Sequence, residues 1–249
     1  MNVFMVLGLD TATTFASVAL VKDGRLVAEE THSGRAGGPP GPPAPRSNHA
    51  EIILPLLDSL LKRAAVPLPE ISALAVSIGP GSFTGLRIGL STAMGLAYGC
   101  DVPVIGIPTL LAIAVRVRNW DGLVCPLLDA RKREVYAALF RKKEERVERL
   151  AEDAVSSPER VLDWIQSAGD GEPCLFVGDG TGAYGEMLKG HLGSRAVLAA
   201  GEAYPSIASA VAQLAEQRLR NREIHPLEPL VPLYLRPSEA ELKAKGLKG

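Results

Sequence analysis

The pattern of apolar and polar residues is clearest between residues 71 and 99. Residues 71–78 (ISALAVSI) are apolar or small and carry no charge, which is typical of a strand buried on both faces. Three glycines and one proline follow within residues 79–85, and such a run predicts a tight turn. Small residues then recur at every fourth position, which predicts a helix over 82–99 with one side free of bulk. These small residues are Gly85, Gly89, Ala93 and Ala97.

Other apolar runs predict the remaining strands and helices by their period. The predicted strands cover 3–10, 15–22, 26–31, 102–107, 123–128, 134–140 and 174–177, and 233–236 is expected to be a short strand or an extended segment. The predicted helices cover 49–64, with its apolar positions from Ile52 onward, and 109–117, 158–167, 183–189 and 205–220. Asn48 is expected to cap the first of these helices, and Pro55 to kink it or shift its start. Asp23-Gly24 is typical of a hairpin turn, so the chain is expected to open with an antiparallel meander.

The composition narrows the class of protein. The chain has 249 residues, of which 47% are hydrophobic and only 5% aromatic, so it can bury a largely aliphatic core. The net charge of −1 argues against bulk attraction to nucleic acid. Three widely spaced cysteines without a Cys-x-x-Cys pair fit a reducing compartment and argue against structural zinc.

Segments without a regular period indicate where the chain is exposed. Residues 34–45 are rich in glycine and proline and are expected to form a flexible surface loop, with a ligand for an aromatic groove as the alternative. The first nine residues lack the basic start of a signal peptide. The longest apolar run, 102–115, contains two prolines and is too short to span a bilayer. We therefore expect a soluble cytoplasmic protein.

Two interpretations of the glycine-rich turn stay open. Free N–H groups at the start of a helix can bind phosphate, but the same turn can serve packing alone. No lysine follows the glycines as in a P-loop, and Gly81 and Gly85 are one residue too far apart for the dinucleotide fingerprint. Pro80 and Thr84 also occupy the glycine positions of a nucleophile elbow around Ser82.

Candidate chemistry elsewhere is weak when each residue is taken alone. Asp10 and the threonines after it stand at a predicted strand end, where they could hold a metal–phosphate group or form an ordinary turn. His49 opens a predicted helix, but Ile53 stands where a second histidine ligand would be. A polar residue at a helix start is the preferred interpretation of His49.

The opening pattern recurs in the second half of the chain. Placing Leu128-Asp129 on Leu9-Asp10 aligns residues 135–139 with 16–20, which suggests two halves of related topology. Residues 131–133 and 141–143 make the hairpin in the second half basic. We interpret it as a solvated hairpin, with a contact to RNA or to an acidic partner as the alternative.

Five motifs, in their order along the chain, resemble the bacterial TsaB (YeaZ) family of tRNA threonylcarbamoyladenosine biosynthesis proteins. They are residues 9–13 (LDTAT), 49–55 (HAEIILP), 79–89 (GPGSFTGLRIG), 129–136 (DARKREVY) and 232–236 (PLYLR). The resemblance spans nearly the whole chain, and 79–89 is its most specific part. Relative to the usual pattern of the family, 34–45 looks like an insertion.

The resemblance implies an α/β fold of two ribonuclease-H-like lobes, as in the actin, Hsp70 and sugar-kinase superfamily, each a mixed sheet flanked by helices. It implies an N-terminal lobe at 1–106 that carries the helices for partner docking, and a smaller second lobe at 107–204. The C-terminal segment 205–249 is expected to pack back onto the first lobe.

The resemblance also implies a role as the non-catalytic partner of TsaD, which transfers a threonylcarbamoyl group to the adenosine beside the anticodon of ANN-reading tRNAs. TsaE is expected to join the assembly, tRNA to be reached only through the complex, and a homodimer to form when TsaD is absent. TsaD carries a metal-binding His-x-x-x-His, which reads His49 to Ile53 in this chain. We therefore expect no metal and no tightly bound cofactor, with ATP or ADP at the interface with TsaD.

Site residues follow from the same resemblance. The helices around 52–61 and 85–97 would form the face that docks TsaD, so Gly89→Arg is expected to abolish pairing and leave the chain folded. The expected interface residues are Ile52, Ile53, Leu56, Leu57, Leu60, Gly85, Gly89, Leu90, Ala93, Met94 and Ala97. The residues expected near a nucleotide are Asp10, Thr11, Gly79, Gly81, Ser82, Thr84, Arg87, Asp129 and Arg131.

The sequence leaves two rival classes of function open, an independent enzyme and an RNA-binding module. Asp10, Thr11 and the glycine-rich turn would also suit an independent phosphotransferase of this fold, and a peptidase-like hydrolase is the other enzymatic alternative. Arg131 to Arg133 and the lysines near the C-terminus would suit an RNA-binding module, although the net charge of −1 counts against it.

Overall fold

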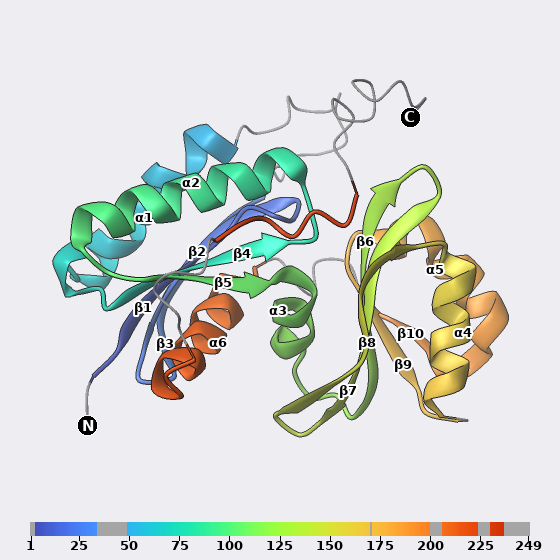
Figure 1. The fold of residues 1–249 in the computed structure, drawn as a ribbon. Helices are drawn as coiled ribbons and strands as arrows, with labels where there is room; N and C mark the ends of the chain where they lie inside the picture. The colour runs from blue at the N-terminus through green and yellow to red at the C-terminus, as the bar shows by residue number, and fades with distance from the viewer. Residues whose placement is uncertain (1–2, 34–48, 170, 200–205, 224–229, 237–249) are drawn as a thin grey trace.

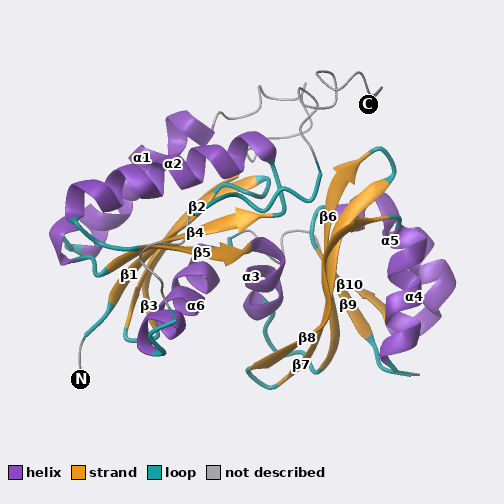
Figure 2. Cartoon of the chain, viewed as in Figure 1, coloured by secondary structure: helices purple, strands orange, loops and turns teal. Residues whose placement is uncertain are grey.

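The computed structural model describes residues 3–33, 49–169, 171–199, 206–223 and 230–236. They form two five-stranded mixed sheets, each with helices packed on its faces (Figures 1 and 2). Some segments with sequence predictions lie outside these residues. They are the glycine- and proline-rich loop 34–45, Asn48, Pro205 and the C-terminal lysines.

The first sheet contains the strands from the N-terminal part of the chain. Its central strand β1 pairs antiparallel with β2 and parallel with β4, and each of these is followed outward by one further strand. In sheet order the strands are β3 (Arg25–Ser33), β2 (Phe15–Lys22), β1 (Met5–Asp10), β4 (Ala73–Gly79) and β5 (Val104–Pro108).

The second sheet repeats this arrangement. Its central strand β6 pairs antiparallel with β7 and parallel with β9. In sheet order the strands are β10 (Ala196–Leu198), β9 (Cys174–Val177), β6 (Gly122–Arg131), β7 (Glu134–Lys143) and β8 (Arg146–Ser156). The related halves predicted from Leu9-Asp10 and Leu128-Asp129 are thus confirmed, because β1 and β6 hold the same place in their sheets. The predicted fold class, two ribonuclease-H-like lobes, is confirmed as well.

The helices cover both sheets. Two of them pack on one face of the first sheet, α1 (His49–Ala64) and α2 (Phe83–Cys100). Two more cover the outer face of the second sheet, α4 (Pro158–Ala168) and α5 (Gly180–Leu192). Between the sheets lie α3 (Thr109–Arg116) and α6 (Ala208–Arg220), and short 3₁₀ turns occur at η1 (Leu68–Glu70) and η2 (Gly193–Arg195).

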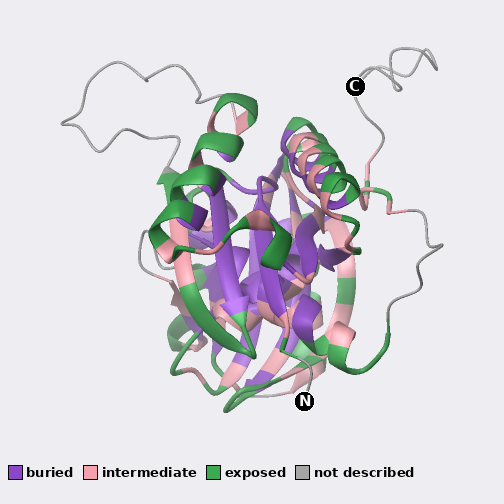
Figure 3. Ribbon diagram, turned by 90° about the vertical axis from the view of Figure 1, so that its left-hand side faces the viewer, coloured by how far each residue is buried: buried purple, intermediate pink, exposed green. Residues whose placement is uncertain are grey.

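The central hydrophobic cluster joins the two halves. It contains Val6 and Ile107 from the first sheet, Phe140 from the second, and the apolar sides of α3 and α6 between them. Helix α6 approaches β1 closely because Gly8 has no side chain, and a Cβ there would overlap the carbonyl oxygen of Ala208. In Figure 3 most strands are buried, whereas the helices have exposed turns on their outer sides.

The sequence prediction left the effect of Pro55 on α1 open and did not include strands β8 and β10. Helix α1 begins at His49 and contains Pro55, so the proline does not shift the start of the helix. Strand β8 was missed, because its eleven residues include five charged side chains and it forms an edge of the sheet, where charged residues are common. No helix among the described residues is both long and apolar enough to cross a membrane.

Candidate functional site

Asp10 lies at the end of β1 and is fully buried. Its carboxylate accepts hydrogen bonds from the backbone N–H of Ala12 (3.0 Å), from the hydroxyl of Thr13 (2.8 Å) and from the hydroxyl of Ser77. Burial raises the pKa of Asp10, and these hydrogen bonds lower it in part. The carboxylate is thus directed to donors of its own chain rather than to solvent.

The glycine-rich turn closes directly onto the loop that follows Asp10. The Ser82 N–H donates to the carbonyl oxygen of Ala12 (2.7 Å), and the Thr11 hydroxyl donates to the carbonyl oxygen of Gly85 (2.7 Å). A Cβ at Gly85 would overlap the Thr11 carbonyl oxygen, and a Cβ at Gly89 would overlap the Thr11 hydroxyl. These two glycines therefore serve close packing within the chain.

This contact between the loops favours the structural interpretation of the turn over an anion site. The hydroxyl of Ser82 caps α2 by accepting from the Gly85 N–H (3.2 Å), and Gly79 donates to the hydroxyl of Thr109 (3.1 Å). The N–H groups of Gly79, Ser82 and Gly85, three of the donors that an anion could use, are thus engaged within the chain. These bonds support the packing role of the turn, and whether a nucleotide binds beside it stays a prediction.

The second sheet carries a corresponding acidic pair. The Asp129 N–H donates to the carboxylate of Asp179 (3.0 Å), and the Asp129 carboxylate accepts from the Arg131 N–H (2.8 Å) and pairs with its guanidinium (3.1 Å). Burial and, to a smaller extent, the charge of Asp129 raise the pKa of Asp179. The structure thus separates the predicted nucleotide-proximal residues into two groups, one on each sheet.

Residues 230–236, here called the C-terminal strap, connect these two groups. The Leu233 N–H donates to the carbonyl oxygen of Ile78 (2.7 Å) on the first sheet. Tyr234 stacks on Phe83, with ring centroids 4.6 Å apart, and its hydroxyl accepts from Arg87 (3.0 Å). Arg236 reaches the second sheet, where it donates to the carbonyl oxygen of Ala130 (3.0 Å) and pairs with Glu134. Sequence reasoning identified the segment but could not assign its contacts.

Most of the expected interface residues are buried within the chain itself. Of this set only Met94 is exposed, and Ile52 and Leu56 are half-buried. The other eight are buried against the chain's own core, which argues against direct contact of their side-chain or Cα atoms with a partner. These are Ile53, Leu57, Leu60, Gly85, Gly89, Leu90, Ala93 and Ala97. A Cβ at Gly89 would overlap the Thr11 hydroxyl, so the structure argues against the expectation that Gly89→Arg leaves the chain folded.

The opposite sides of α1 and α2 carry exposed apolar residues. Leu54 is 51% exposed, Met94 is 50% exposed and Tyr98 is 92% exposed. A Cβ at Gly95 or Gly99 would meet no atom within 4 Å. We call these five residues the outer face. The sequence contained a signal for it, because Met94 and Tyr98 are four residues apart and adjacent to the buried positions Ala93 and Ala97.

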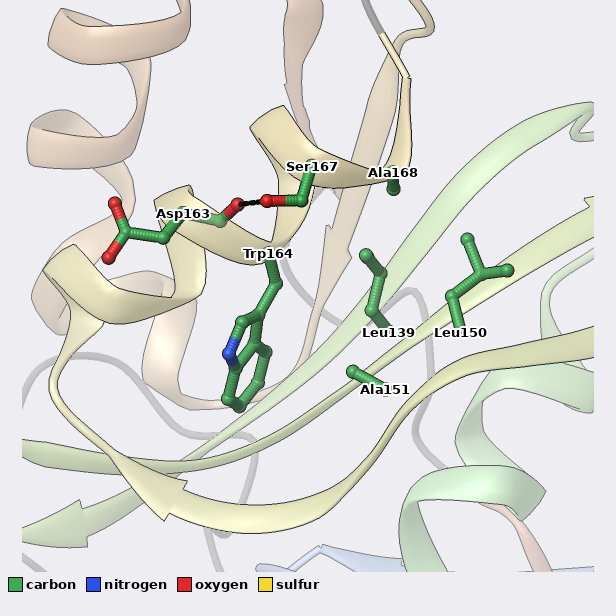
Figure 4. Close-up of a pocket in the computed structure, with 7 residues that line it drawn as sticks. All are labelled: Leu139, Leu150, Ala151, Asp163, Trp164, Ser167 and Ala168. Carbon is green, nitrogen blue, oxygen red and sulfur yellow. Dashed lines mark hydrogen bonds between the residues drawn. The ribbon is translucent and has the colours of Figure 1, made fainter.

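Metal ligands and pockets elsewhere in the described residues add nothing to this site. No group of three or more His, Cys, Asp or Glu side chains in those ranges is placed to hold a metal ion, and Ile53, at the place of a second histidine ligand, is buried in the core. A pocket of about 440 Å³ lies between α4 and β7 and β8, with Trp164 along it (Figure 4). It contains none of the predicted site residues.

Comparison with known proteins shows the family of the chain. A family model described as TsaD, tRNA N6-adenosine threonylcarbamoyltransferase, matches residues 25–244. The tRNA threonylcarbamoyladenosine biosynthesis protein TsaB of Escherichia coli (strain K12) is 34% identical over 244 residues, covering 97% of this chain and 98% of that protein. The chain belongs to the TsaB family. TsaB of Bacillus subtilis (strain 168) is 29% identical over 240 residues and is covered to 96%, as is this chain.

A solved structure supports the same family. It is an uncharacterized protein with similarity to peptidase YEAZ from Pseudomonas aeruginosa, which is 30% identical to this chain. The two superpose with a TM-score of 0.74 over 94% of this chain and 100% of the other. The TsaB-family resemblance predicted from the five sequence motifs is therefore confirmed.

Proposed function

We propose that this protein is a non-catalytic scaffold subunit that pairs with TsaD in forming threonylcarbamoyladenosine beside the anticodon of ANN-reading tRNAs. Its similarity along nearly the whole chain to proteins named for this biosynthesis supports the proposal. TsaE joins the same assembly, and tRNA is bound through the complex. No cofactor binds tightly to this chain, and ATP or ADP binds at the contact with TsaD.

The outer face of α1 and α2 is the observation that carries this proposal. Gly95 and Gly99 lie on the exposed side of a helix and contact nothing that would require a glycine. A glycine inside a helix costs roughly 1 kcal/mol relative to alanine. Beside them, Tyr98 is 92% exposed. A surface that combines open glycines with a protruding aromatic side chain allows a second helix to approach closely and bury the aromatic ring.

The buried state of Asp10 supports a non-catalytic role. A group that binds metal–phosphate must present free oxygens to its ligand, but both carboxylate oxygens of Asp10 accept hydrogen bonds from the chain. Ile53 likewise stands in the core at the place of a second metal-binding histidine. In our proposal the chemistry belongs to TsaD, and this chain supplies a rigid docking surface.

The outer face could also serve contact between two copies of the chain. When its partner is absent, an exposed apolar surface favours association with another protein surface, because this removes apolar area from water. A second copy of the chain can use the same residues in an isologous contact. We therefore propose that the protein forms a homodimer through this face when TsaD is absent and exchanges it for the heterodimer when TsaD is present.

Tyr98→Lys tests the docking surface. Lysine is depleted at interface cores, and a cation near the C-terminus of α2 is favourable for the helix dipole, so the fold should be retained. We expect affinity for TsaD, measured by isothermal titration calorimetry, to fall about 30-fold or more, the effect of losing a hot spot of about 2 kcal/mol.

Leu26→Lys is the matched control, since Leu26 is 46% exposed but lies on edge strand β3. It should leave the affinity for TsaD unchanged. Equal affinities for the wild-type protein and Tyr98→Lys, with thermal unfolding unchanged in both, would reject the outer face as the docking surface.

A further inference from the structure

The turn between β6 and β7 has an unusual backbone for its residues. Lys132 and Arg133 form a two-residue hairpin loop between the paired residues Arg131 and Glu134. Arg131, Lys132 and Arg133 have φ values of 65°, 53° and 62°, in the left-handed region that disfavours side chains other than glycine, asparagine and aspartate. The β2–β3 loop of the same chain uses the favoured pair Asp23-Gly24. Lysine and arginine thus occupy two turn positions at which asparagine and glycine would be more stable.

Contacts below the turn hold it in this conformation. The Asp129 carboxylate accepts from the Arg131 N–H and pairs with the Arg131 side chain. From the C-terminal strap, Arg236 donates to the carbonyl oxygen of Ala130 and pairs with Glu134. Each of these two acidic residues is therefore matched with an arginine. Lys132 and Arg133 are exposed, and neither takes part in an ion pair between described residues.

The strap relates the turn to the start of α2, the helix whose later part carries Met94, Gly95, Tyr98 and Gly99 of the outer face. Within the strap, Tyr234 accepts from Arg87 on α2, and Arg236, two residues later, binds the β6–β7 hairpin. Figure 1 shows the tip of this hairpin and the start of α2 at the same end of the molecule. A partner that covers the outer face and extends along α2 to its start would reach the end of the molecule that carries the two cations.

We propose that Lys132 and Arg133 contact the phosphodiester backbone of tRNA in the assembled complex. This inference rests on the proposed function, pairing with TsaD. Lysine and arginine are the side chains that neutralise phosphates, and such contacts position a nucleic acid without reading its sequence. Holding both cations in a fixed turn reduces the conformational entropy lost on binding. Two contacts are too few for the lone chain, with its net charge of −1, to hold tRNA.

The double variant Lys132→Asn, Arg133→Gly tests this contact and is not expected to unfold. Asn-Gly is the preferred pair for this kind of turn, so thermal stability should stay equal or rise. We expect weaker binding of tRNA to the complex with TsaD, and a higher KM for tRNA at unchanged kcat. Losing two phosphate contacts should flatten the slope of log K against log salt by about 1.4 to 1.8. The affinity ratio of wild type to variant should then fall about 7- to 12-fold between about 50 and 200 mM salt.

Lys143→Asn, Arg146→Asn is the matched control, since it removes the same charge from the β7–β8 hairpin at the other end of β7. Its affinity for tRNA and its salt slope should equal those of the wild type. Equal tRNA affinity and salt slope for the wild type and the turn variant would overturn the proposal. Loss of pairing with TsaD in the turn variant, without tRNA present, would overturn it in favour of a protein contact. Failure of the proposed function would instead appear in the wild-type protein, which would not support modification at all.

Discussion

The close approach of α2 to the loop after β1 predicts opposite effects for two glycine-to-alanine changes in one helix. A Cβ at Gly85 would overlap the Thr11 carbonyl oxygen and come within 3.1 Å of the Ser82 Cβ. A Cβ at Gly95 would have nothing within 4 Å. Gly95→Ala gains about 1 kcal/mol of helix propensity in the helix interior, and Gly85→Ala, in the first turn of α2, gains at most that. The difference in stability between the two variants therefore reports mainly the packing.

For Gly85→Ala the gain is outweighed. Overpacking against backbone costs about 1–3 kcal/mol, and displacing Thr11 weakens its buried hydrogen bond to Gly85, which is worth about 1 kcal/mol. We expect a net loss of about 2 kcal/mol, or about 4–8 °C in Tm for a chain of this size. Gly95→Ala should instead gain about 1 kcal/mol, or about 2–4 °C.

Thermal and urea unfolding followed by circular dichroism would measure both variants. Equal stability of Gly85→Ala and Gly95→Ala would refute the packing argument. A Gly85→Ala protein with wild-type stability that fails to bind TsaD would go further, because it would show that Gly85 belongs to the docking surface after all.

Two further predictions concern the carboxylates of buried Asp10 and half-buried Glu29, which accept hydrogen bonds from the chain. Folding raises the pKa of Asp10 above its ordinary 3.8, so ionising Asp10 costs the folded state stability. The stability of Asp10→Asn relative to wild type should therefore grow as pH rises above about 3.8. It should level off above the raised pKa. A difference in urea midpoint that is independent of pH would contradict this. Glu29 accepts from the Ser206 hydroxyl (2.7 Å) and the Ser209 N–H (3.2 Å), so Glu29→Ala should lose roughly 2–4 kcal/mol by leaving buried donors unpaired, and an unchanged urea midpoint would refute it.

Much of the fold followed from the sequence because local pattern and topology agreed. The uncharged run at 71–78, the glycine-rich turn and the small-residue helix correspond to β4 and α2. The recurrence of an apolar strand ending in aspartate located β1 and β6, the centres of the two sheets. Strand β8 was not predictable in this way, since an edge strand buries only part of its surface and its charges obscure the alternation.

The candidate site was less predictable, because one periodic stripe has the same appearance whether it packs on the chain's own sheet or on a partner. Gly85 and Gly95 lie in one helix, and only the fold shows that the first contacts Thr11 and the second contacts nothing in the chain. The strap is a similar case. The contact of Arg236 with Ala130 joins residues 106 positions apart, and no local pattern specifies such a pair.

A subunit that scaffolds TsaD must determine whether tRNA is modified. The most direct measurement is a reconstitution with TsaD, TsaE, a threonylcarbamoyl-adenylate synthase, ATP, threonine, bicarbonate and tRNA, with this protein added or left out. We predict that threonylcarbamoyladenosine forms only when the wild-type protein is added, and that Tyr98→Lys does not replace it. Equal modification by TsaD without this protein would contradict the account.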